Sequence, residues 1–80
     1  MKAKVYISYK DGILDPQGQT VGGALDSVGI KGIKNVRIGK YVEISFDDVC
    51  KEKAKEITDE SCRKLLANPN TETYHFEIEE

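Results

Sequence analysis

The chain has 80 residues, a formal net charge of -2 at pH 7 and an isoelectric point near 5.4. This length fits a single domain, residues 1–80, with only a marginal hydrophobic core, and such chains commonly need disulfides, metals or association for stability. The acidic balance argues against a surface for nucleic acid or anionic membrane, and no apolar run could span a bilayer. We expect a cytoplasmic protein that binds neither nucleic acid nor membrane.

Disulfides and metals are poor candidates for that extra stability. Cys50 and Cys62 are the only cysteines, and His75 is the only histidine. Both cysteines fall in one predicted helix, where a rise of about 1.5 Å per residue separates them by roughly 18 Å, too far for a disulfide. Two cysteines and one histidine also lack the spacing of a metal finger. We therefore expect free thiols, no metal site, and association with partner proteins.

The stretch from Asn35 to Asp48 predicts the central strand, around which the other elements are placed. Its apolar residues share even numbers, whereas the residues between them are polar or amphipathic, which is typical of a half-buried strand. A two-residue hairpin at Gly39-Lys40 would shift the inward-facing set to odd numbers, but the parity does not change. The pattern therefore favours one long strand, kinked at Gly39, that pairs within its own sheet and projects beyond it.

A strand and a short helix are predicted before this stretch. Lys2–Lys10 alternates as a first strand. Asp15 followed by Pro16 predicts a helix start, and Gly29 predicts its end. Apolar residues at helical spacing form a stripe that we expect to pack onto a sheet: Val21, Ala24, Leu25 and Val28. Gly22 and Gly23 inside this helix cost about 1 kcal/mol each relative to alanine, so packing must hold it.

A second helix and a last strand follow. We expect Asp47 or Asp48 to cap the helix, which should run to about Ala67 before Pro69 stops it. Its predicted inner line is Cys50, Ala54, Ile57, Ser61 and Leu65. Tyr74, Phe76 and Ile78 then alternate with polar residues as the last strand.

These elements predict an α+β, two-layer sandwich in which two helices cover one face of an antiparallel sheet. The order is β-α-β-α-β with a long central strand, or β-α-β-β-α-β if that strand breaks at Gly39, a variant of the ferredoxin-like fold. The other face would carry Tyr6, Tyr41, Ser45 and His75 among charged residues. This mixture suits a subunit interface better than plain solvent or a core.

No catalytic constellation is present. The chain has no supported nucleophile and base, no HExxH motif and no phosphate-binding glycine pattern. Asp15 near Gly18 is better explained as a helix cap than as a phosphate loop, and Asp47-Asp48 as caps than as magnesium ligands. The sequence IGKYVEISF distantly suggests an RNA-stacking strand, but Glu43 on that face and the acidic chain oppose this interpretation.

Three segments in register resemble the PurS family, the small subunit of formylglycinamidine ribonucleotide (FGAM) synthase. They are LDPQG from Leu14, VRIGKYVEI from Val36 and CRKLLANP from Cys62. The resemblance implies a non-catalytic, PurS-like domain within an ATP-dependent ligase complex of purine biosynthesis. It implies that the chain joins a glutaminase subunit to a large synthetase subunit, helps ammonia pass between them and associates with itself. ATP and magnesium would bind the large subunit, and this chain would hold no cofactor.

We expect the partner contacts on two groups of residues. The first is the start of the first helix, Asp15, Pro16, Gln17 and Gly18, and the second is the middle of the long strand, Arg37, Gly39, Lys40, Tyr41 and Glu43. No acidic residue near Arg37 or Lys40 in the sequence would neutralise them, so we expect their charges to be free for another surface. An alternative function from another class is a regulatory module of ferredoxin-like shape that binds a small ligand.

Overall fold

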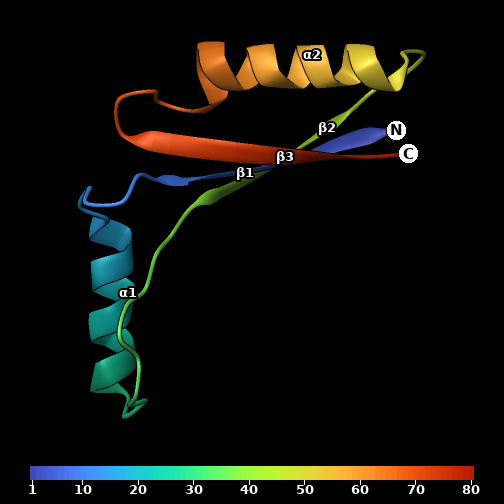
Figure 1. Cartoon of the computed structure of the whole chain (residues 1–80). Coiled ribbons are helices and arrows are strands. Elements are labelled where there is room, and N and C mark those ends of the chain that lie inside the picture. Colours follow the sequence, from blue (N-terminus) through green and yellow to red (C-terminus); the bar gives the residue numbers. More distant parts are fainter.

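The computed structural model describes all 80 residues, in the predicted order of three strands and two helices (Figure 1). The elements are β1 (Lys2–Tyr9), α1 (Pro16–Ser27), β2 (Lys40–Ser45), α2 (Lys51–Ser61) with a π-helical turn (Cys62–Leu66), and β3 (Glu72–Glu79). The chain is L-shaped and measures 50 × 26 × 14 Å. Its radius of gyration is 16.0 Å, whereas a compact chain of this length has about 12 Å.

The three strands form one antiparallel sheet in the order β2-β1-β3. Val5 at the centre of β1 lies opposite Val42 of β2 and Phe76 of β3. The core is small: eight residues are buried, and the apolar ones come from β1, α2 and the turn that follows α2. The α+β class and the antiparallel sheet are as predicted.

Helix α2 covers one face of the sheet, but two details of its prediction are wrong. Its N-cap is Cys50 rather than Asp47 or Asp48. Cys50 and Leu65, both predicted on the inner line, are exposed, Leu65 by 83%, whereas Ala54, Thr58 and Cys62 are buried. The wide π-helical turn explains the exposure of Leu65, because more residues per turn rotate Leu65 outward and bring Leu66 toward the core.

Helix α1 begins and ends as predicted but does not lie on the sheet. Asp15 caps its N-terminus, and Gly29, with φ of +89°, follows its C-cap in the left-handed conformation. The helix instead projects from the end of the sheet and packs along residues 30–39 (Figure 1). The expectation that both helices cover the sheet is therefore wrong for a single chain, and Val28 of the stripe is 73% exposed.

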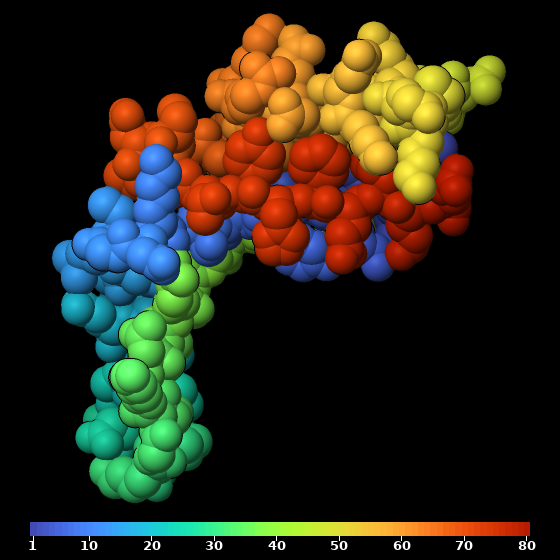
Figure 2. Space-filling view, viewed as in Figure 1, coloured from blue at the N-terminus to red at the C-terminus, as the bar shows by residue number.

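The long central stretch makes no hairpin, as predicted, although only Lys40–Ser45 is paired as a strand. Residues 30–39, here called the return segment, run back along α1 to the sheet, and Figure 2 shows the two side by side. We call α1 and the return segment together the arm, residues 15–39. Neither helix combines the length and the apolar character that a crossing of the bilayer requires.

Candidate interface site

The corner between arm and sheet is held by Asp15. Its carboxylate accepts hydrogen bonds from the backbone N–H groups of Gly18, at 2.8 Å, and Ile38, at 2.7 Å. These bonds, first that from Ile38, hold the pKa of Asp15 below its ordinary value of 3.8. We call these two hydrogen bonds the Asp15 clasp. Its contribution to the stability of the fold is complete above the pKa that Asp15 has in the unfolded chain, and it is lost as the pH falls through the lower pKa of the folded chain. Asp15 joins the start of α1 to the return segment.

Two glycines allow backbones to approach closely at this corner. A Cβ atom on the buried Gly18 would lie 2.3 Å from the carbonyl oxygen of Val36, and one on Gly39 would lie 2.5 Å from that of Ile7. Any side chain there would push the return segment away from α1 or from β1. From the sequence, both glycines were predicted to contact a partner. The structure shows that they are needed for packing within the chain itself.

Several predicted interface residues lie around hollows at the corner. Pro16 and Gln17 line a shallow hollow of about 430 Å³ with Ile38. Gln17 also borders a second hollow, of about 210 Å³, together with Gly39 and Lys40. Members of both predicted groups, which are distant in the sequence, are thus brought together at one place. The sequence could not show this, because it depends on how α1 turns back.

Arg37 and Lys40 are not free, contrary to expectation. Arg37 donates to the carbonyl oxygen of Tyr9 and lies 3.4 Å from the carboxylate of Asp11. Lys40 donates to the carbonyl oxygen of Leu66, at 3.2 Å, and lies 3.8 Å from Glu72. Their partners are distant in the sequence, so inspection of neighbouring residues could not find them. Both cations help to fix the arm where it joins the sheet.

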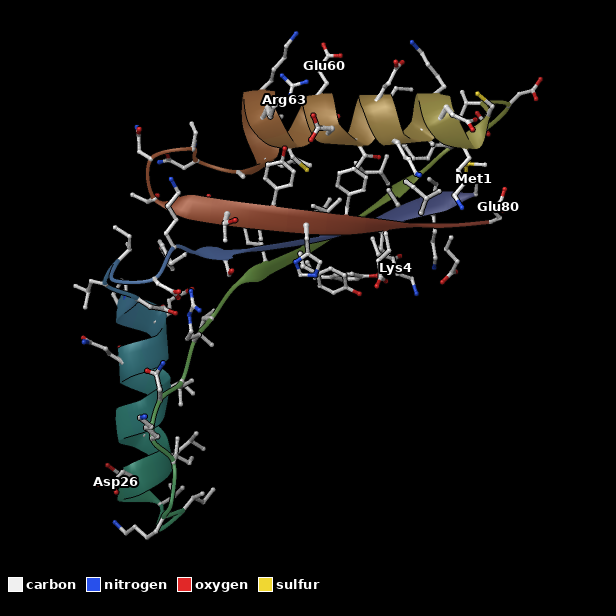
Figure 3. All side chains as sticks on the ribbon, in the orientation of Figure 1. Met1, Lys4, Asp26, Glu60, Arg63 and Glu80 are labelled. Carbon is white, nitrogen blue, oxygen red and sulfur yellow. The ribbon has the colours of Figure 1, made fainter.

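Tyr41 and Glu43 lie on the sheet face turned away from α2, here called the open face. Figure 3 shows Lys4 on this face. The Tyr41 hydroxyl donates to Glu43 at 2.7 Å, and this bond is the main cause that raises the pKa of Tyr41 to about 12. Tyr6 lies between Tyr41 and His75, with ring centroids 5.2 and 4.8 Å away. The predicted amphipathic face is confirmed, and nothing in this chain covers it.

Most of the return segment exposes backbone that makes no hydrogen bond within the chain. From Lys31 to Arg37, no backbone N–H or C=O group makes a hydrogen bond. Val36 and Ile38 are half-buried toward α1, while Asn35 and Arg37 are exposed, so the alternation of β2 continues through Gly39. An extended, unpaired segment of this kind can accept a further strand.

The arm also exposes large apolar side chains, namely Val21, Val28, Ile30 and Ile33, and Leu14, directly before the arm, is exposed as well. Apolar surface gathered on a small arm is typical of a protein interaction site. No three or more His, Cys, Asp or Glu side chains gather where a metal ion could bind. The arrangement provides surfaces for other chains, together with an extended backbone edge.

Comparison with known proteins agrees with a chain that provides surfaces for other subunits. The profile of the family PurS, described as phosphoribosylformylglycinamidine (FGAM) synthase, matches residues 2–80. The chain belongs to the PurS family. The PurS subunit of Bacillus subtilis is 43% identical over 79 residues, which cover 99% of this chain and 93% of that protein. That of Methanocaldococcus jannaschii is 40% identical over 78 residues, 98% of this chain and 94% of that protein.

Solved PurS structures share the fold. The M. jannaschii structure has a TM-score of 0.88, with 99% of this chain and 95% of that chain covered at 39% identity. A chain of the PurLQS structure from Thermotoga maritima has a TM-score of 0.85, with 95% and 93% covered at 32% identity. The resemblance noted in the sequence is thus confirmed, and PurS is a subunit of FGAM synthase, a ligase complex of purine biosynthesis.

Proposed function

We propose that this FGAM synthase subunit bridges the glutaminase and the ATP-dependent synthetase in the cytoplasm and assists the passage of ammonia between them. The observation that carries the proposal is the incomplete packing of the chain. It buries eight residues, leaves one sheet face open and extends an apolar arm with unpaired backbone. Such a chain gains most of its stability from partners. ATP and magnesium belong to the large subunit in this proposal.

Reconstitution with the glutaminase and synthetase of the same organism tests the bridging function. Without this chain, glutamine-dependent synthesis should fall about tenfold or more, because ammonia released by the glutaminase is no longer held near the synthetase. Synthesis fed with concentrated external ammonia should change much less. Equal loss with both nitrogen sources would mean that the chain acts on the synthetase itself and would contradict bridging.

The same exposed features support self-association. The return segment offers six extended residues before Gly39, from Ile33 to Ile38, and β2 offers six residues with a free edge after it. Two copies can pair the return segment of each chain with the free edge of β2 of the other, if their long strands run antiparallel across a two-fold axis at Gly39. Each β2 then gains the return segment of the second copy as a neighbouring strand.

This pairing would also complete the two-layer fold. Val42 and Ile44 face the core beneath α2, and Val36 faces α1, since a Cβ atom on Gly22 would lie 3.6 Å from the Val36 side chain. In the two-fold pairing, Val36 of one copy lies opposite Val42 of the other, and side chains that lie opposite each other point to the same face of the sheet. Helix α1 of the second copy therefore lies on the same face as α2. Each sheet then has four strands and two helices on one face, and the exposed stripe of α1 is covered.

Disulfide cross-linking tests this register. In a Cys50→Ser background, which removes the exposed thiol, R37C combined with Y41C should form an intermolecular disulfide under mild oxidation, because these positions lie opposite each other. The control is K34C with Y41C, whose side chains point to opposite faces. A monomer in sedimentation experiments, or equal cross-linking of both pairs, would contradict the pairing.

A further inference from the structure

The open face carries a row of three aromatic side chains, one from each strand. Tyr41 of β2 lies across from Tyr6 of β1, which lies across from His75 of β3. The Tyr6 and His75 rings are stacked, with an interplanar angle of 18° and centroids 4.8 Å apart. Tyr6 and Tyr41 remain 36% and 50% exposed. A flat, accessible aromatic surface of this kind is suited to a planar cation.

The next row on this face contains one carboxylate without a partner. It consists of Glu43, Lys4 and Glu77, again one residue from each strand. Lys4 is bound to Glu79 at 2.7 Å, and Glu43 accepts from Tyr41 and lies 3.5 Å from Lys2. Glu77 makes neither an ion pair nor a side-chain hydrogen bond. Its free negative charge lies on the same face as His75, two residues further along β3.

We propose that the open face docks a segment of a partner subunit that presents an arginine over the His75–Tyr6 stack and pairs it with Glu77. An arginine fits better than a lysine, because its planar guanidinium stacks on aromatic rings and binds a carboxylate with two donors. The inference rests on the proposed bridging function and assigns one contact to it.

A second copy of the chain that pairs through the free edge of β2 does not occupy this site. The proposed self-pairing uses the free edge of β2, whereas His75 and Glu77 belong to β3 on the opposite edge of the sheet. Helix α2 covers the other face. The β3 side of the open face is therefore still accessible when the two copies are paired, and a different subunit can reach it.

Binding of the labelled chain to the glutaminase and synthetase subunits of the same organism tests the contact. We expect E77Q and H75A each to weaken binding about 5- to 30-fold, because each removes one side of the arginine site. The matched control is E52Q, since Glu52 is another exposed carboxylate without an ion pair, on α2. Free arginine should compete with binding more strongly than free lysine at equal ionic strength.

The outcomes separate this inference from the proposed function. Thermal melts and sedimentation of E77Q and H75A should match those of the unmodified chain, since both side chains are exposed. If the unmodified chain binds its partners but E77Q and H75A bind equally well, or E52Q loses as much, the arginine site is refuted while bridging stands. If the unmodified chain binds neither subunit, the bridging function fails and the inference fails with it.

Discussion

Replacing Ile7 by alanine should lower the free energy of unfolding by about 2–5 kcal/mol. Ile7 is 2% exposed and belongs to a core of only four clustered buried residues, together with Val5, Cys62 and Ala67. A cavity at this place has few neighbours that could collapse into it. For a chain of this length, whose whole stability is expected to be roughly 4–12 kcal/mol, the loss approaches unfolding. Urea titration followed by circular dichroism measures it.

The matched control is L65A. Leu65 is as large as Ile7 but 83% exposed, so its removal should change the free energy of unfolding by less than about 0.5 kcal/mol. Both variants must be compared at the same protein concentration, because self-association would add to the apparent stability. A large loss in L65A would show that the helix continues without the π-helical turn and that the inner line predicted from the sequence is correct.

Replacing Gly18 by alanine should have the second large effect, a loss of about 1–3 kcal/mol. The new Cβ atom would lie 2.3 Å from the carbonyl oxygen of Val36 and 2.9 Å from the carboxyl group of Asp15. The first of these neighbours is backbone, so the return segment must move away from α1 and the Asp15 clasp must loosen. We expect G18A to weaken self-association as well, which sedimentation equilibrium would detect.

Gly23 offers a control of the same chemistry in the same helix. A Cβ atom there would meet nothing within 4 Å, and the residue is exposed. G23A should therefore raise the free energy of unfolding by about 0.5–1 kcal/mol, because alanine loses less backbone entropy in a helix. If G18A proved as stabilising as G23A, the close contact between α1 and the return segment would be wrong.

Local signals predicted the elements that depend on neighbouring residues. Asp15 and Pro16 start α1 by filling the cap and the first helical position, and Gly29 ends it in a conformation that costs glycine little. The constant parity around Gly39 excluded a hairpin, and the alternation of β1 and β3 was confirmed. The family was also evident from three short segments. Apart from the family, which needs all three segments in register, each of these inferences uses residues within a few positions of one another.

Which surface meets which depends on contacts between segments that are distant in the sequence. Periodicity shows that α1 has an apolar stripe, but it does not show which surface the stripe packs against. In a single chain α1 does not pack on the sheet. The same limit explains the errors at Arg37 and Leu65. Arg37 finds its partners 26 and 28 residues away, and one wide turn suffices to rotate Leu65 out of the core. The strands and helices could be predicted because they follow from local conformation, and the family because its characteristic segments can be read directly in the chain. The position of the arm, the Asp15 clasp and the aromatic row depend on contacts between distant segments, and only the folded chain brings those together.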